Sequence, residues 1–299
     1  MRINIKEILD DNTSGSFTIT ENTLQIFDEY VDYATKSNID INEVFDEIHS
    51  SAKQLVKQQP NMALLRKYIY GLVTSFKRLL SSDKKRAEIL DLLAEKIKSS
   101  QQNLIKDIET ISSNGAKVIT NFNKILTYSN STVVKSLFLR AIEMNRKFEV
   151  FCVKSDPPNE GVSLAEELVD LNIKTSLVAD SQAGTIIDDM NLVLLGADRV
   201  YETGFVNKAG SLSICLLAAH FNIPVYLAVE TSKILKESER LIKKVEKDTR
   251  EIYSGEKDIE VFNSYYEKIP LNLVSKVISE EGVFETAEFL SWYLGENDG

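Results

Sequence analysis

Two patterns of hydrophobic positions divide the chain. Up to residue 115, apolar residues recur every three or four positions, which predicts a series of amphipathic helices. Asp40 and Glu43 form a capping-box pattern at the start of one of them, and Asn114-Gly115 ends the last. Residues 1–115 are therefore expected to form an N-terminal helical domain.

From Lys117 onward, short apolar runs alternate with helical patterns. The expected strands are residues 125–128, 148–153, 175–178, 192–195 and 225–229, and helical patterns at 132–144, 164–171 and 212–220 separate most of them. This alternation implies βαβ units and a mainly parallel sheet. The predicted fold class is α/β, with a Rossmann-like domain over residues 116–299 and a ligand crevice between the two domains. The absence of a G-x-G-x-x-G motif and of a P-loop argues against a standard dinucleotide or nucleoside triphosphate binder.

The C-terminal part of the chain is more charged than the rest. Residues 232–262 contain a Lys-Lys-Val-Glu-Lys-Asp run and are predicted to form a solvated helix. After Tyr265–Pro270, the sequence predicts a further helix that contains Leu273, Val274, Val277 and Ile278.

Composition narrows the classes of function. The 299 residues carry a net charge of −10, which disfavours direct nucleic-acid binding. Neither a charged-then-apolar leader nor a membrane-length apolar run is present, so a cytoplasmic protein without membrane contact is expected. Cys152 and Cys215 lie in apolar runs and are predicted to be buried rather than disulfide-bonded. The two histidines, His49 and His220, lie in different regions, and neither a metal site nor a cofactor is expected.

Polar residues stand at the ends of four predicted strands. They are Tyr128 with Ser129, Asp180, Asp198 and Glu230. Any one of them would suit a loop or a helix cap, but ligands bind beyond the carboxyl ends of parallel strands, so the coincidence favours a pocket. Asn207 and Lys208 precede a helical pattern and can place an amide, an ammonium group and helix N–H groups around an anion.

Five segments carry a resemblance to a known family. They are Thr127–Ser131, Asp180-Ser181, Gly196–Arg199, Gly204–Ser211 and Val229–Lys233. From about Lys117 to Gly282 the chain resembles the family that joins the alpha, beta and delta subunits of translation initiation factor 2B to isomerases of methylthioribose-1-phosphate and ribose-1,5-bisphosphate. The resemblance implies pairing through the Rossmann-like half, as a homodimer or with a related subunit.

The resemblance also implies a set of ligand-binding residues: Ser129, Asn130, Asp180, Asp198, Asn207, Lys208, Glu230 and Lys233. Asp198 corresponds to the acidic residue that the isomerases use in proton transfer, and a carboxylate in an apolar crevice can have a raised pKa. Ser129 stands where the isomerases have cysteine, and a serine hydroxyl is a far weaker acid than a thiol. Ser129 is therefore interpreted as the N-cap of the helix near Thr132, and as catalytic, with Asp198, only in an isomerase.

A second departure is Pro157, at a position where the family commonly has an arginine. Proline removes a bidentate phosphate donor. Both departures favour an alpha-type regulatory subunit that binds partner subunits or initiation factor 2, and whose pocket takes a small phosphorylated metabolite as an effector. The alternative is an aldose–ketose isomerase of a phosphorylated ribose, in which Ser129 replaces the thiol with help from water. A third reading is a metabolic binding protein without a role in translation.

Overall fold

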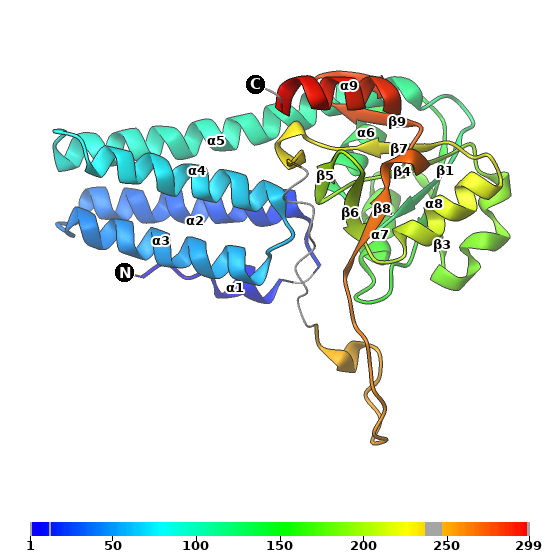
Figure 1. Ribbon diagram of the computed structural model, residues 1–299, viewed down its shortest axis with the longest axis horizontal. Helices are drawn as coiled ribbons and strands as arrows, with labels where there is room; N and C mark the ends of the chain where they lie inside the picture. The colour runs from blue at the N-terminus through cyan, green and yellow to red at the C-terminus, as the bar shows by residue number, and fades with distance from the viewer. Residues whose placement is uncertain (1, 12, 237–246, 298–299) are drawn as a thin grey trace. The chain divides into compact units, whose positions relative to one another are not determined.

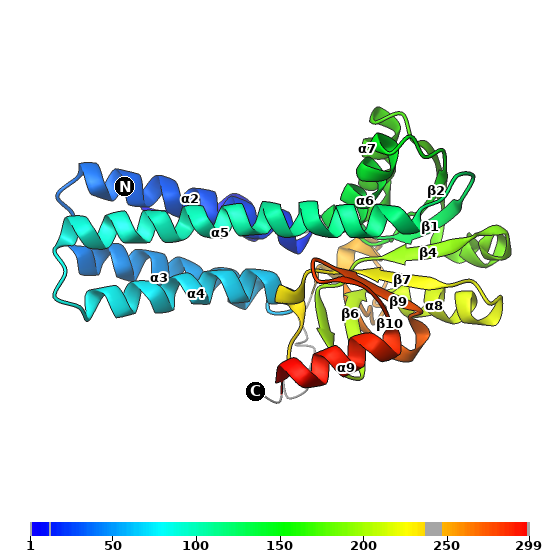
Figure 2. The ribbon, with the colours of Figure 1, turned by 90° about the horizontal axis from the view of Figure 1, so that it is seen from above.

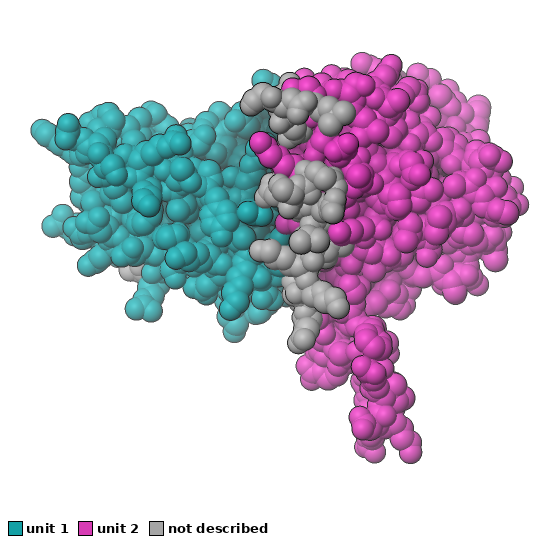
Figure 3. Space-filling model, viewed as in Figure 1, with its two compact units in different colours: residues 1–107 teal, residues 108–299 magenta. Residues whose placement is uncertain are grey.

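The computed structural model describes residues 2–11, 13–236 and 247–297. The chain divides into two compact units, residues 1–107 and 108–299 (Figure 3). Helix α5 (Arg86–Gly115) begins in the first unit, and its last residues belong to the second. The predicted domain boundary after residue 115 falls at the end of this helix. That boundary and the crevice between two domains stay predictions.

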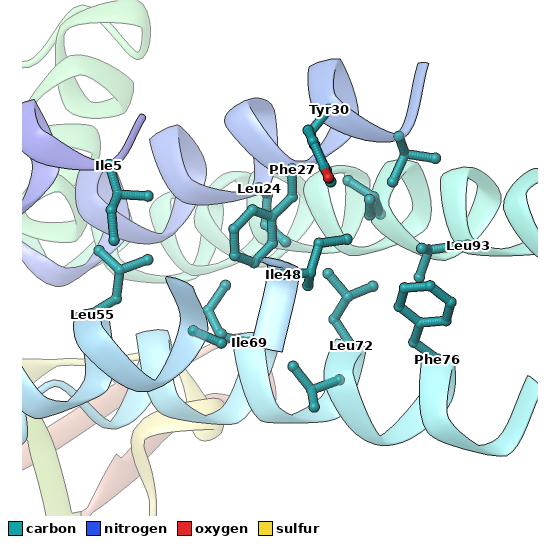
Figure 4. Packing of buried hydrophobic residues seen from close by; sticks show 14 of the residues in the cluster. Ile5, Leu24, Phe27, Tyr30, Ile48, Leu55, Ile69, Leu72, Phe76 and Leu93 are labelled. Atoms are coloured by element: carbon teal, nitrogen blue, oxygen red, sulfur yellow. The ribbon is translucent and has the colours of Figure 1, made fainter. Parts of the chain in front are cut away.

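The first unit is helical, as its apolar spacing predicts. It contains α1 (Lys6–Asp10), α2 (Ser16–Lys36), α3 (Ile41–Gln58), α4 (Ala63–Leu80) and most of α5. The Asp40 side chain caps α3 by accepting the Asn42 N–H at 2.8 Å. The apolar stripes of these helices meet in one core that includes Phe27, Ile48 and Phe76 (Figure 4). Burial of these stripes is what stabilises the helices in this unit.

The second unit is built on a seven-stranded sheet in the order β10-β9-β7-β4-β1-β2-β3. Its strands are β1 (Lys124–Tyr128), β2 (Glu149–Val153), β3 (Lys174–Val178), β4 (Leu192–Leu195), β7 (Val225–Ala228), β9 (Lys276–Ser279) and β10 (Gly282–Glu285). Every neighbouring pair is parallel except β10 with β9. The predicted mainly parallel α/β fold is confirmed, and the carboxyl ends of the parallel strands meet at one edge of the sheet.

Helices cover both faces of this sheet (Figures 1 and 2). They are α6 (Thr132–Glu143), α7 (Glu160–Asp170), α8 (Ser211–His220) and α9 (Thr286–Asn297). On β4, Leu192 and Leu194 pack with α6 and α7, whereas Val193 and Leu195 pack with α8 and α9. A central strand buried on both faces reads as a continuous apolar run, which is why residues 192–195 could be predicted as a strand.

A small antiparallel sheet was not predicted. It joins β5 (Arg199–Tyr201), β6 (Gly204–Lys208) and β8 (Tyr266–Pro270) in the order β5-β6-β8. Phe205 pairs with Ile269 in its register, and both side chains are buried in the core that also holds α8. This sheet places Asn207 and Lys208 on a strand that the sequence did not predict.

The predicted helix over residues 232–262 is wrong for the described residues. Residues 231–233 and 249–251 form single 3₁₀ turns, residues 252–264 form an extended arm (Figure 1), and residues 237–246 lie outside the described residues. Side-chain hydrogen bonds hold the base of the arm in place of the backbone hydrogen bonds of a helix. The Asn263 amide donates to the Asp248 carbonyl at 2.8 Å and to the Glu251 carboxylate at 2.7 Å. High charge alone therefore does not specify a helix here.

The helix predicted after Pro270 is also wrong. A 3₁₀ turn at Leu271–Leu273 leads into β9, where Val277 pairs with Leu227 of β7 and Ile278 with Ala228. The spacing of these apolar residues fits a helix as well as a strand, and pairing with the neighbouring strand decides between the two. In the part of the chain that the structure describes, each helix is too short or too polar to span a membrane.

Candidate functional site

Ser129 follows directly after β1 in an unusual backbone conformation. Its φ is 69°, in the left-handed region that non-glycine residues seldom adopt. Its N–H donates to the Ser155 Oγ at 2.8 Å, and its hydroxyl donates to Glu160 at the start of α7. The N-cap of α6 is Ser131, whose Oγ accepts the Val134 N–H at 3.4 Å, so the prediction that Ser129 caps this helix is wrong.

Glu160 connects Ser129 to Lys208. One Glu160 oxygen accepts the serine hydroxyl, and the other lies 3.5 Å from the Lys208 Nζ. The Lys208 side chain is 4% exposed, and its Nζ has no hydrogen-bond partner. Burial raises the pKa of Glu160, against the opposing charge of Lys208, and burial lowers the pKa of Lys208 against the charge of Glu160. Each charged group thus loses hydration on burial, and the opposite charge of its partner compensates for part of that loss.

Asp198 follows β4, where the chain passes close to the start of α6. A Cβ at Gly196 would lie 2.4 Å from the Ser131 Oγ, so only glycine fits this approach. Burial raises the pKa of the Asp198 carboxyl to about 6, and nearby Glu160 and Glu230 add to the increase while Lys233 opposes it. A carboxyl that titrates near neutral pH can act as a general acid or base.

Glu230 and Lys233 form a second buried ion pair, beyond the end of β7. Their charged groups lie 2.8 Å apart, and the two residues are 1% and 5% exposed. Asp198 interacts electrostatically with Glu230 and Lys233 as well as with Glu160. Two ion pairs, Lys208–Glu160 and Lys233–Glu230, therefore surround one carboxyl group of raised pKa.

The other three candidate residues hold the chain together. Asp180 accepts the Tyr128 hydroxyl at 2.7 Å and the Asp156 N–H at 3.3 Å, so each of its oxygens has a donor. Asn207 donates its amide to the Ser211 Oγ at 2.9 Å, and Asn130 donates to Glu167 at 3.3 Å. Asp180 follows the end of β3, as predicted, whereas Asn207 lies on β6 of the small sheet. The hydrogen-bond partners of all three residues belong to the chain itself.

The N-terminus of α8 already binds an anionic group. Glu267 of β8 accepts the N–H groups of Gly210 and Leu212, each at 2.7 Å, through one carboxylate oxygen. Helix N–H groups were expected to bind a ligand anion at this point, and that expectation is corrected for these two donors. The helix dipole and both donors stabilise the carboxylate of Glu267 instead.

Sequence reasoning missed Glu160, Glu267, Tyr265 and Tyr266. Burial first, and then the charges of Asp198 and Glu160, raise the pKa of Tyr266 well above its usual value, so this phenol belongs to the same group of residues. Glu160 follows the end of β2 by a few residues, and the rule applied to the other strand ends could have found it. Glu267 and the tyrosines carry no such signal, because their strand was not predicted.

The arrangement offers acid–base and anion-binding groups but no reactive thiol. The chain has two cysteines, and both are free and buried in hydrophobic clusters. Burial raises the pKa of Cys152 and of Cys215 to about 12. Among the described residues, no group of three or more histidine, cysteine, aspartate and glutamate side chains is placed to hold a metal ion.

Comparisons with known proteins give relatives of two kinds. The chain is 27% identical over 272 residues to a ribose 1,5-bisphosphate isomerase of Methanocaldococcus jannaschii. The aligned region covers 89% of this chain and 85% of the isomerase. It is 33% identical over 152 residues to translation initiation factor eIF2B subunit alpha of Caenorhabditis elegans, across half of each chain. Factor subunits and sugar-phosphate isomerases thus match at similar identity.

Solved structures share the fold. A translation initiation factor eIF-2B of Pyrococcus horikoshii superposes with a TM-score of 0.77 at 23% identity, over 94% of this chain and 95% of that one. A chain of the tetrameric eIF2B-beta2-delta2 complex of C. thermophilum superposes with a TM-score of 0.68 at 17% identity, over 97% and 92%. The model of the initiation factor 2 subunit family matches residues 12–286. The chain therefore belongs to the initiation factor 2 subunit family.

Proposed function

We propose that this protein is a non-catalytic, alpha-type regulatory subunit that binds partner subunits or initiation factor 2 and takes a small phosphorylated metabolite as an effector. The observation that carries the proposal is the absence of a usable thiol. Ser129 stands at the resembling isomerases' cysteine position and donates to Glu160, and both cysteines of the chain are core residues. The scaffold is kept, while the strongest acid–base candidate at this position is replaced.

The buried Lys208 supports an anionic ligand. Its Nζ is out of contact with water and has unused donors, and an unsatisfied buried donor costs about 1–3 kcal/mol unless a ligand supplies an acceptor. A phosphate group offers several strong acceptors together with the matching charge. The carboxylate of Asp198, which interacts electrostatically with Lys208, can accept hydrogen bonds from sugar hydroxyls.

One observation favours the alternative, an aldose–ketose isomerase of a phosphorylated ribose. Serine needs an adjacent base to act as an acid–base catalyst. Glu160, whose pKa burial raises, accepts a hydrogen bond from the Ser129 hydroxyl. Asp198, with a pKa of about 6, would supply the second proton-transfer group. In this reading Ser129 and Asp198 are the catalytic pair.

Turnover separates the two readings. The wild-type protein is incubated with ribose-1,5-bisphosphate or methylthioribose-1-phosphate, and ketose formation and thermal shift are followed in the same samples. We expect a shift without turnover, because loss of a competent acid–base group costs about 10²–10⁴ in rate. The M. jannaschii isomerase is the positive control. Turnover at about 1 per second or faster, lost in Asp198→Asn, would establish the alternative instead.

Assembly is the other part of the proposal. We expect a homodimer, or a pair with a related subunit, through the second unit. Helix α8 supports this expectation because it is apolar on most faces and still leaves large apolar side chains exposed. Leu216 on the helix is 53% exposed, and Phe221 just after it is 39% exposed. A stable interface buries at least about 1,000 Å². Sedimentation equilibrium at micromolar protein should give the mass of a dimer, and a monomer mass would leave only the pair with a related subunit.

A further inference from the structure

The ring of Tyr265 lies against two ammonium groups. The Lys208 Nζ is 3.9 Å from the ring centroid, and the Lys247 Nζ is 4.4 Å from the same centroid. The two ammonium groups therefore lie no farther apart than the sum of these distances. Burial, and also the charge of Lys208, lower the pKa of Lys247, while Glu251 and Glu160 oppose the decrease. Two like charges have been brought together around one aromatic ring.

The two carboxylates nearest Lys208 accept hydrogen bonds from other groups. Glu251 accepts the Tyr265 hydroxyl at 2.6 Å and the Asn263 amide at 2.7 Å, one on each oxygen. Glu160 accepts the Ser129 hydroxyl, and its other oxygen stays 3.5 Å from the Lys208 Nζ, which is long for a hydrogen bond. Lys208 is therefore left as a buried ammonium group without a hydrogen-bonded acceptor, a role that an anionic ligand can fill.

We propose that Lys208 and Lys247 form a two-ammonium subsite over the ring of Tyr265 that binds the phosphate group of the effector. The inference rests on the proposed function and adds to it the residue Lys247, from the charged segment that the sequence indicated as solvated. A phosphate dianion reduces the repulsion between the two ammonium groups and supplies the acceptor that Lys208 lacks. The aromatic ring stabilises the cations when no ligand is bound. Lys247 thus sets the preference for a phosphorylated ligand over a neutral sugar.

The test uses inorganic phosphate as the probe and the full chain as the protein. Phosphate is titrated by calorimetry into wild type, Lys247→Ala, Lys247→Arg and Lys208→Ala. Lys257→Ala is the matched control, since it removes the same charge from an exposed position of the following arm. We expect Lys247→Ala to weaken binding about tenfold, the loss of one charge-assisted contact. Lys247→Arg should keep most of the affinity, and Lys257→Ala should stay within about twofold of wild type.

Three outcomes would overturn the subsite: no phosphate binding by wild type, equal affinity of wild type and Lys247→Ala, or equal weakening by Lys247→Ala and Lys257→Ala. Thermal melts accompany each titration, and Lys247→Ala decides the matter if Lys208→Ala does not fold. Ribose-1,5-bisphosphate, titrated in parallel, separates the two proposals. If it binds wild type and Lys247→Ala equally, the subsite is wrong and the proposed function stands. If phosphate behaves as expected but no sugar phosphate binds, the subsite stands and the proposed effector is wrong.

Discussion

Replacing Lys233 by methionine should lower the free energy of unfolding of the second unit by about 3–5 kcal/mol. Lys233 and Glu230 are 5% and 1% exposed, and their charged groups are 2.8 Å apart. Methionine keeps much of the volume of the lysine stem but leaves the Glu230 carboxylate buried without its counter-ion. Losing a partner from such a pair costs far more than the pair itself contributes, because the remaining charge keeps its desolvation penalty.

Urea unfolding followed by the fluorescence of Trp292 measures this change, since the single tryptophan of the chain lies in the second unit. Lys174→Met is the control, because the Lys174 side chain is 72% exposed in its pair with Glu149 and should cost under about 1 kcal/mol. The double variant Glu230→Gln with Lys233→Met should recover much of the loss. A single variant that loses no more than the control would show that water reaches this pair.

Replacing Asp198 by asparagine should stabilise the protein above neutral pH by about 1–3 kcal/mol. The unfolded carboxyl ionises near 3.8 and the folded one near 6, so the native state holds an extra proton between these values. Wild-type stability therefore falls as the pH rises from about 4 to 6, and the full penalty of the buried charge is present above 6. The amide carries no such penalty.

Unfolding of both proteins is compared at several pH values between 4 and 8. The difference should be small near pH 4 and complete above pH 7. Charges that face this carboxyl, from Glu160, Glu230, Lys233 and Arg199, are the same in both proteins. An asparagine variant that is equally or less stable across the whole range would show that the carboxylate is well solvated or well paired. A carboxylate kept at a cost in stability is what a functional site is expected to contain.

The sequence predicted those parts of the fold that depend on local pattern. Residues 192–195 are apolar on both faces, and Ser211–His220 has a helical composition with a clear start after Gly210, so both elements were found. Strand β9 was not, because Val277 and Ile278 have a spacing that suits either state until they pair with β7. The base of the arm is fixed by Asn263 bonding to residues 12 to 15 positions earlier, which no periodicity reveals.

Prediction of the site shows the same limit. Ser129, Asp198 and Glu230 were found because each follows a strand, and parallel strands bring such positions to one edge of the sheet. Lys208 was found because it precedes a helical pattern, and Lys233 was indicated by the family resemblance. Their roles depend on partners that are far away in sequence. Glu160 is 48 positions before Lys208, and Tyr265 is 57 positions after it, so the charge balance of the site emerges only from the folded chain.

Glu267 competes with any phosphate for the N–H groups at the start of α8. Its carboxylate is covalently part of the chain and is held 2.7 Å from two N–H groups of α8. A tethered group acts at an effective concentration of about millimolar or above, whereas a free ligand competes at its own concentration. Dilute anions therefore do not displace Glu267 from the helix end. Side chains of the site, and not the N–H groups that Glu267 accepts, therefore select the ligand. Substitution of one such side chain can change the preferred ligand without altering the fold.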